Sequence, residues 1–224
     1  QYELVKDLVP GVIYDEISRI IKVEKKEPRR KIGKIVVCTA GTADIFVAEE
    51  AAQVAEYFGA CVTRIYDVGV SGIHRLFSKI EEIQSANCVI AAAGMAAHLP
   101  GMCAALFPMP VVGVPMSGKN LEGEDALFSI VQMPPGIPVA TVAIDGAQNA
   151  ALLACQMLSI DDEEVANRLQ AKREADAIKA LEDAKKNKQM YEQFSVVAEK
   201  FLPLERNREE SFVVIIAKSP TDLK

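Results

Sequence analysis

Short apolar runs alternate with alanine-rich segments of helical length over residues 33–160, and this alternation constrains the fold more than any other feature of the chain. The runs with the length and composition of strands are 34–38, 61–66, 87–92, 110–114 and 139–144. The segments of helical length are 44–58, 73–84, 96–106, 125–131 and 147–158. Strands that are apolar on both faces and are each followed by a helix predict a parallel sheet covered on both sides. We therefore expect a doubly wound, three-layer α/β/α domain over residues 33–160.

The segments on either side of this core have a different character. Near the N-terminus four isoleucines are spaced as on one face of a helix: Ile13, Ile17, Ile20 and Ile21. Because a charged run follows them, residues 1–32 are expected to form a short helix and a solvated linker. Residues 161–224 begin with a charged stretch that carries one narrow apolar stripe. This pattern predicts a long helical extension that packs on the domain or on a partner subunit. A compact strand-like run at 212–216 has no assigned role.

Composition narrows the classes of partner. The chain has 224 residues, and 25 Lys and Arg stand against 31 Asp and Glu, which gives a formal net charge of −6. Nucleic acid and anionic membranes are therefore poor partners. No apolar stretch reaches the roughly 18 residues of a transmembrane helix. Five scattered cysteines and only two histidines favour a reducing compartment and no metal. The expected location is the cytoplasm, and an organellar stroma or matrix stays open because the sequence begins at Gln1.

Ligands of doubly wound sheets bind beyond the carboxyl ends of the strands, so the loops after the predicted strands form the candidate site. The first loop, 38–44, is a small turn that opens a helix, where free backbone amides and the helix dipole favour an anion. Asp44 either caps this helix or accepts hydrogen bonds from sugar hydroxyls. The second loop carries a hydroxyl, an imidazole and a guanidinium at Ser71, His74 and Arg75. Such a set can hold a phosphorylated substrate and move a proton.

The third loop, 91–102, contains small residues that let the backbone approach a ligand closely. It also carries His98, the second of the two histidines in the chain. Two histidines on neighbouring ligand-side loops are the strongest physical indication of function, because histidine titrates near neutral pH. The fourth loop, 116–123, is polar, and Ser117 is a further candidate substrate contact. Neither a GxGxxG nor a GxxxxGK[ST] motif is present, which argues against dinucleotide redox chemistry and phosphoryl transfer.

These loops resemble one known family. Residues 94–102 read Gly-Met-Ala-Ala-His-Leu-Pro-Gly-Met, which matches the Gly-x-Ala-Ala-His-Leu-Pro-Gly-Met loop of the PurE family. PurE proteins are carboxylases and mutases of purine synthesis that act on aminoimidazole ribonucleotide. The family's Gly-Ser-x-Ser-Asp loop resembles residues 40–44, where Gly41 and Ala43 stand in place of two serines. Its Ser-Ala-His-Arg loop resembles residues 71–75 with one residue added. The resemblance extends over about residues 34–158.

The resemblance implies a flavodoxin-like fold and an enzyme without metal or cofactor. The expected reaction forms or moves a carboxylate on the ring of a ribonucleotide, with aminoimidazole ribonucleotide converted to carboxyaminoimidazole ribonucleotide in the synthesis of purines. Carbon dioxide or bicarbonate is the second reactant. Family members are octamers with sites at subunit contacts, so the resemblance also implies a homo-oligomer.

Residue roles follow from the same resemblance. Asp44 would hold the ribose hydroxyls, and Ser71 and Arg75 would hold the phosphate. His74 would act as general acid and base, while His98 would orient the carboxylate or the adjacent loop. The remaining expected substrate contacts are backbone and side-chain groups of Gly41, Thr42, Gly94, Met95, Ala96, Ala97, Leu99 and Ser117.

Two other hypotheses stay open at this point. Residues 39–44, 47–51 and 65–76 resemble the related LarB branch, which carboxylates the pyridinium ring of nicotinate adenine dinucleotide for a nickel-pincer cofactor. LarB proteins use an acidic residue and a nucleophilic cysteine near the positions where Ala96 and Met133 stand in this sequence. The third hypothesis is a non-catalytic PurE-like subunit that serves as a scaffold or regulator, with residues 161–224 as its docking element.

Overall fold

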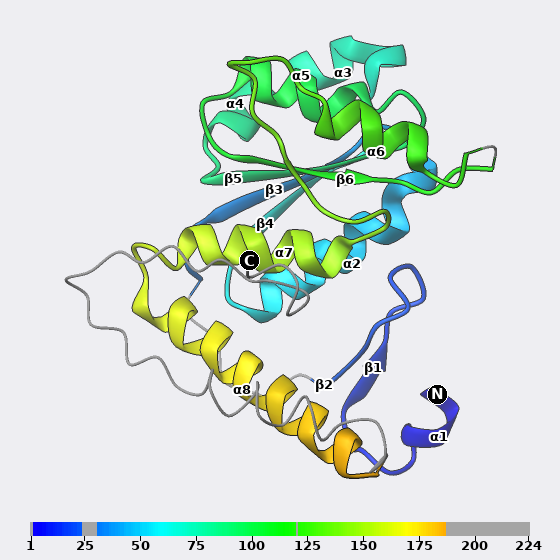
Figure 1. Cartoon of the computed structure of the whole chain (residues 1–224), viewed down its shortest axis with the longest axis vertical. Coiled ribbons are helices and arrows are strands. Elements are labelled where there is room, and N and C mark those ends of the chain that lie inside the picture. The colour runs from blue at the N-terminus through cyan, green and yellow to red at the C-terminus, as the bar shows by residue number, and fades with distance from the viewer. Residues whose placement is uncertain (1, 24–30, 120, 187–224) are drawn as a thin grey trace, which may run out of the picture. The chain divides into compact units, whose positions relative to one another are not determined.

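The structure is a computed structural model that describes residues 2–23, 31–119 and 121–186 (Figure 1). By its internal contacts the chain divides into two units, Gln1–Lys172 and Arg173–Lys224. The first unit contains the sheet and its covering helices. The described part of the second unit is the remainder of the long helix α8 (Glu163–Lys186).

The centre of the first unit is a five-stranded parallel sheet with the order β4-β3-β5-β6-β7. Its strands are β3 (Lys34–Thr39), β4 (Cys61–Ile65), β5 (Cys88–Ala93), β6 (Val111–Pro115) and β7 (Ala140–Thr141). The chain reverses its direction of winding between β3 and β5, which is where doubly wound sheets bind ligands. The predicted α/β fold is confirmed. The fifth strand is shorter than predicted, because only two residues of 139–144 pair with β6.

Helices cover both faces of this sheet (Figure 1). One face is packed by α2 (Ile45–Tyr57) and α7 (Ala147–Leu158). The other face is packed by α3 (Ile73–Phe77), α4 (Ile80–Gln84), α5 (His98–Leu106) and α6 (Glu124–Val131). Alternate residues of β3 serve the two faces: Ile35 and Val37 pack toward α2 and α7, while Val36 and Cys38 pack toward the other helices. Both buried helices of the first face are rich in alanine, so their backbones lie close to the strands.

The helix predicted over 73–84 is interrupted. The structure has α3 and α4 in its place, with Ser78 and Lys79 between them. The Ser78 hydroxyl donates to the backbone carbonyl of Arg75 at 2.7 Å, and local bonds of this kind compete with helix continuation. Two short 3-10 turns, η1 (Thr42–Asp44) and η2 (Val70–Gly72), precede α2 and α3.

The helix predicted from the N-terminal isoleucines is wrong. Beyond a single turn of helix, α1 (Tyr2–Val5), the chain forms an antiparallel hairpin of β1 (Val12–Tyr14) and β2 (Ile21–Val23). Turn chemistry overrides the helical spacing, since the backbone amide and hydroxyl of Ser18 both donate to Asp15 Oδ1 at 2.7 Å. The turn docks on α2, where Gln53 Nε2 donates to the Ser18 hydroxyl at 3.0 Å. Residues 24–30 of the expected linker lie outside the described residues.

The predicted C-terminal helix is present as α8 and is described as far as Lys186. Val165 and Leu169 of the predicted apolar stripe are buried in the core of the first unit. Nearby, Arg168 Nη1 donates to the carbonyl of Phe58 at 2.8 Å. The strand-like run at 212–216 lies outside the described residues. Among the helices that the structure describes, none combines the length and apolar character needed to cross a membrane.

Candidate active site

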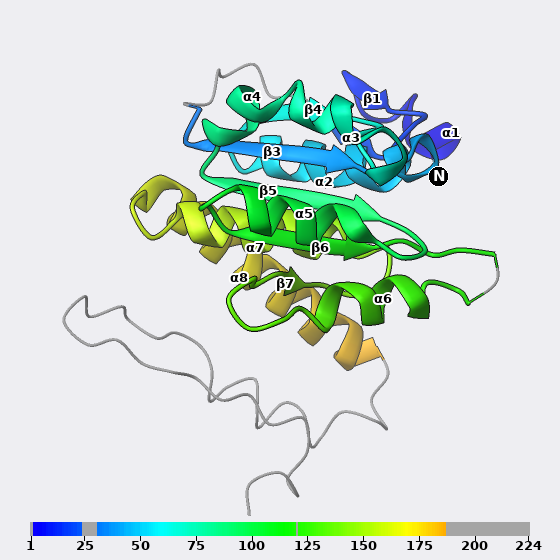
Figure 2. The same cartoon turned by 90° about the horizontal axis from the view of Figure 1, so that it is seen from above.

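The loops that carry the candidate residues meet at one edge of the sheet. Figure 2 shows the arrowheads of β3, β5 and β6 ending at this edge, as parallel strands require. Backbone hydrogen bonds join the loops to one another: the Ala40 amide donates to Ala92, the Gly69 amide to Ala40, and the Met116 amide to Ala93, at 2.9 to 3.0 Å. The first four loops of the sequence prediction are therefore assembled into a single region.

Asp44 lies at the end of η1 in the first loop, and its carboxyl group is half-buried. Its Oδ2 accepts a hydrogen bond from the Gly41 amide at 3.0 Å. Burial raises the pKa of Asp44, and the nearby charge of Asp145 raises it further. Thr42 is exposed beside it. The loop thus offers a partly desolvated carboxylate and a free hydroxyl, a combination that can bind sugar hydroxyls and a phosphate oxygen.

In the second loop, two of the polar candidate side chains are exposed and the third is already paired. Ser71 and His74 are exposed on η2 and in the first turn of α3. Arg75 is already engaged, because its Nε donates to the Asp67 carbonyl and its Nη2 lies 3.2 Å from Asp67 Oδ1. Its guanidinium also covers Gly72, where a Cβ atom would lie 2.3 Å from Arg75 Nη1. A phosphate bound by Arg75 would either share the guanidinium with the carboxylate of Asp67 or displace that carboxylate.

The third loop holds an unusual backbone conformation. Met95 and Ala97 have φ angles of 56° and 42°, a left-handed region that costs free energy for residues with a Cβ atom. The Ala97 amide closes the turn by donating to the Gly94 carbonyl at 3.0 Å. Ala96 and His98 are exposed, whereas Leu99 is buried in the core. Of the expected contacts, Leu99 and Ala97 are therefore buried, with 1% and 3% of their surfaces exposed.

A groove of about 410 Å³ runs beside this loop. It is lined by His98 and Met102 of α5, by Val70 of the second loop, and by Met133 and Ile137 after α6. The groove is largely apolar, and Asp44 and His74 are outside its lining. The structure thus places His98 next to the second loop but sets it on an apolar wall, apart from the polar groups of the first loop.

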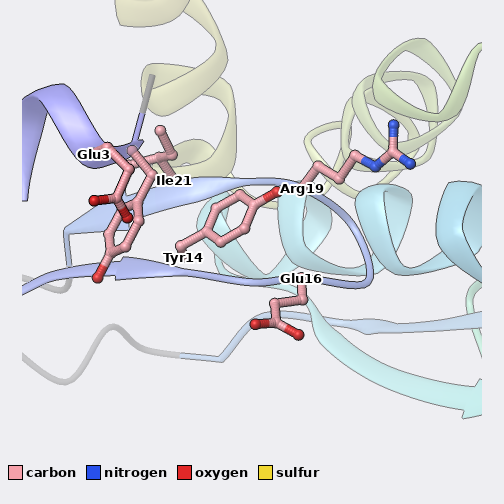
Figure 3. A pocket seen from close by; sticks show the side chains of 6 residues that line it. Glu3, Tyr14, Glu16, Arg19 and Ile21 are labelled. Carbon is pink, nitrogen blue, oxygen red and sulfur yellow. The ribbon is translucent and has the colours of Figure 1, made fainter.

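A second hollow, of about 510 Å³, lies at the N-terminal segment. Tyr2 and Tyr14 stack there with ring centroids 5.3 Å apart. Figure 3 shows that the guanidinium of Arg19 and the carboxylate of Glu3 point away from one another. The polar groups of this hollow do not converge on a common point, as a ligand site would require.

Asp145, which follows β7, is a residue at this edge that the sequence prediction missed. Its Oδ1 accepts a hydrogen bond from the backbone amide of Ser117 at 2.9 Å, and its charge acts on Asp44. The Asp145-Gly146 pair after a predicted strand was the available signal, because this dipeptide marks turns. Ser117 itself is exposed. Among residues 2–23, 31–119 and 121–186, no group of three or more His, Cys, Asp or Glu side chains is placed to hold a metal ion.

Both the fold and the loops agree with one family of enzymes. The family model described as AIR carboxylase matches residues 34–179, and the chain belongs to this family. Its relatives include the N5-carboxyaminoimidazole ribonucleotide mutase of Pyrococcus abyssi, with 46% identity over 152 residues, 64% of this chain and 85% of the relative. The mutase of Methanocaldococcus jannaschii is 42% identical over 160 residues, 70% of this chain and 99% of the relative.

A shorter match and a solved structure complete the comparison. The phosphoribosylaminoimidazole carboxylase of Ogataea methanolica is 65% identical over 76 residues, 34% of this chain and 14% of that protein. The crystal structure of PurE from Treponema denticola superimposes with a TM-score of 0.62 at 25% identity and covers 68% of this chain and 97% of its own. The resemblance to PurE proteins found in the sequence is confirmed.

Proposed function

We propose that this protein is a PurE-type enzyme of purine biosynthesis that acts as an N5-carboxyaminoimidazole ribonucleotide mutase. The observation that carries the proposal is the 42% identity over 99% of the length of the Methanocaldococcus jannaschii mutase. The geometry supports it, because the nucleotide-binding and proton-transferring residue types occupy connected loops at the switch point of the sheet. The scaffold and LarB-type hypotheses are not favoured by these relatives.

Direct carboxylation is the second candidate. It is favoured by the 65% identity with the Ogataea methanolica carboxylase. That match covers a much smaller share of the relative than the mutase matches do. Both reactions place a carboxylate on the ring carbon and then remove the proton from that carbon. They differ in the source of the carboxylate, because only the mutase must first protonate the exocyclic nitrogen to release carbon dioxide from its own substrate.

In the proposed mechanism the first two loops bind the nucleotide. The carboxylate of Asp44 accepts hydrogen bonds from the ribose hydroxyls, and its partial desolvation strengthens these bonds. The hydroxyls of Thr42 and Ser71 and the guanidinium of Arg75 hold the phosphate. Asp67 keeps the Arg75 guanidinium oriented until the phosphate arrives, so that little side-chain freedom is lost on binding.

His74 carries the proton chemistry. Protonation of the exocyclic nitrogen breaks its bond to the carboxylate and releases carbon dioxide, which then adds to the ring carbon. Loss of the proton from that carbon restores the aromatic ring, so one proton is given and one is taken. An imidazole suits both steps at neutral pH. The third loop confines the carbon dioxide beside the ring, since proximity and exclusion of water favour its recapture.

The enzyme is proposed to work as a homo-oligomer. In a single chain the candidate site is an open edge with an apolar groove beside it rather than a closed cavity. A second copy that covers this edge would exclude water from the reacting ring. Light scattering on the purified protein tests this point, and a monomer at micromolar concentration would contradict it.

The function is tested by mass spectrometry of products formed with isotope-labelled bicarbonate. The protein is incubated separately with aminoimidazole ribonucleotide, carboxyaminoimidazole ribonucleotide carrying its carboxylate on N5, and nicotinate adenine dinucleotide. Rearrangement of the N5-carboxylate without uptake of label supports the mutase, while label in the imidazole product supports the carboxylase. His74→Asn should abolish turnover and leave the melting temperature unchanged. A carboxylated pyridinium, or no product from any substrate, would refute the proposal.

A further inference from the structure

The loop after β7 carries a carboxylate that the proposed mechanism does not use. Asp145 Oδ1 accepts a hydrogen bond from the Ser117 amide at 2.9 Å. The Asp145 amide donates to the carbonyl of Pro115 at 2.9 Å, and its own carbonyl accepts from the Ala147 amide at 2.8 Å. Asp145 is thus fixed on both sides, by the end of β6 and by the start of α7.

These bonds act on the start of the β6–α6 loop, whose described residues there are exposed. Ser117, Gly118 and Lys119 are exposed, and a Cβ atom on Gly118 would meet nothing within 4 Å. At the other end of the loop, a Cβ atom on Gly123 would lie 2.8 Å from Ile144. Residues 144–145 therefore contact both ends of the β6–α6 loop, and Asp145 supplies the polar contact at the Ser117 end.

Asp145 also lies close to the first loop of the site. Its negative charge acts on the half-buried carboxyl group of Asp44. Within the part of the chain that the structure describes, this carboxyl group accepts a hydrogen bond from Gly41 of its own loop and is repelled by the charge of Asp145. Because α2 and α7 pack together on one face of the sheet, the loops that open these helices, with Asp44 and Asp145, lie at the same edge. The tether between Asp145 and Ser117 is therefore on the side of the site where the ribose would bind under the proposed function.

We propose that Asp145 is a positioning residue, which fixes Ser117 and the start of the β6–α6 loop beside Asp44 so that this loop contacts the bound nucleotide. The inference rests on the proposed function, since it assigns a nucleotide to this edge. It adds a residue and a loop that act on nucleotide binding and not on the chemical step.

The backbone conformation of Asp145 provides matched variants. Its φ angle of 55° lies in the left-handed region, which Asn and Gly adopt more readily than other residues. Asp145→Asn keeps an oxygen that can accept from the Ser117 amide and removes the charge. Asp145→Gly keeps the backbone conformation and removes the tether. Asp161→Asn and Asp161→Gly make the same changes at an exposed position after α7 and serve as controls.

The test combines amide hydrogen exchange of the loop with steady-state kinetics on N5-carboxyaminoimidazole ribonucleotide. For Asp145→Gly we expect exchange at Ser117 to become at least about 10-fold faster and KM to rise about 10-fold, because a hydrogen bond to a charged group is lost. The kcat should stay within about 2-fold of the wild-type value, because the lost contact stabilises the bound substrate and the transition state equally. Asp145→Asn and both Asp161 variants should resemble the wild type in exchange and in KM.

Three outcomes would contradict either the positioning role of Asp145 or the proposed function, and they distinguish one from the other. Faster exchange in Asp145→Gly with an unchanged KM would refute the positioning role while the proposed function stands. A 10-fold rise of KM in Asp145→Asn would show that charge rather than the tether matters, and this variant decides the question if the glycine variant fails to fold. A wild-type protein that converts none of the nucleotides would refute the proposed function itself.

Discussion

The backbone amide of Gly69 donates a hydrogen bond to the carbonyl oxygen of Ala40 at 3.0 Å, and a Cβ atom on Gly69 would lie 2.4 Å from that same oxygen. The first two loops of the candidate site therefore approach one another more closely than any side chain at this position allows. The requirement is one of space, because the φ angle of Gly69 is −69° and is open to every residue.

Gly69→Ala is expected to separate these two loops. Forcing a methyl group into a packed contact costs about 1–3 kcal/mol, and each kcal/mol lowers the melting temperature of a domain of this size by about 2–4 °C. Nucleotide affinity should fall together with stability, because Asp44 and Arg75 belong to the two loops. Calorimetry and binding measurements check both effects. Gly118→Ala is the control for stability, since open space surrounds Gly118, and equal melting temperatures of the two variants would contradict the prediction.

Asp44→Asn is expected to weaken nucleotide binding while stabilising the fold at neutral pH. The pKa of Asp44 is raised mainly by burial, so the folded state binds this proton more tightly than the unfolded state does. The carboxylate therefore opposes folding above its folded-state pKa, and stability returns as pH falls through that value. The amide of Asn removes this penalty and can still accept from Gly41. Loss of charge-assisted bonds should raise KM about 10- to 100-fold.

The same group predicts a pH dependence. In the wild type, KM for the nucleotide should rise as pH falls through the raised pKa of Asp44, because a protonated carboxyl accepts fewer hydrogen bonds. Asp44→Asn should lose this dependence. A variant that keeps the acidic rise of KM would assign that titration to another group.

Gly41→Ser is expected to be accepted and to tighten binding. Gly41 has an extended backbone, with φ −130° and ψ 171°. The atom nearest to a Cβ added at this position would be Asp44 Oδ2, at 3.7 Å. The PurE family resemblance places a serine here, and one added hydrogen bond to the phosphate would lower KM about 2- to 10-fold. A raised KM would show that this enzyme holds the phosphate in a different way.

Thiol labelling should distinguish one cysteine from the other four. Cys61 is partly exposed on β4, whereas Cys38, Cys88, Cys103 and Cys155 are buried. Burial raises the pKa of Cys88 and Cys155 to about 12, so their reactive thiolate forms are scarce at neutral pH. A chromogenic disulfide reagent should release about one equivalent from the native protein and five after unfolding. Cys61→Ser should remove the native reaction, and rapid labelling that survives in this variant would contradict the prediction.

The helices and strands that were predicted correctly are those that follow from the spacing of apolar residues along the sequence. The helix expected at 147–158 is present as Ala147–Leu158, because its alanine face and its glycine entry leave no competing structure. The order of strands and helices in the α/β domain was predicted correctly because each element has its own apolar pattern. The hairpin at Val12–Tyr14 and Ile21–Val23 was not predicted, because two hydrogen bonds from Ser18 to Asp15 decide a turn that the isoleucine spacing does not reveal.

Contacts between residues that are far apart in the chain could not be predicted from the sequence. Arg75 was correctly placed on a ligand-side loop, but its pairing with Asp67 depends on how the loop folds over Gly72. The link between Asp145 and Ser117 joins residues 28 positions apart, and no local pattern marks such a pair. The roles assigned to His74 and His98 stay predictions, since the structure fixes their places and not their chemistry.

The two-residue pairing of β7 with β6 has a consequence for how the site moves. Segments with few ladder bonds have the lowest free energy of local opening and fluctuate first. Asp44 and His74 follow β3 and β4, which pair over five residues, whereas Asp145 follows β7. Asp145 therefore depends for its position on its hydrogen bonds to Pro115 and Ser117 rather than on ladder pairing. Loss of the Ser117 bond is expected to mobilise this margin before it disturbs the residues proposed for chemistry.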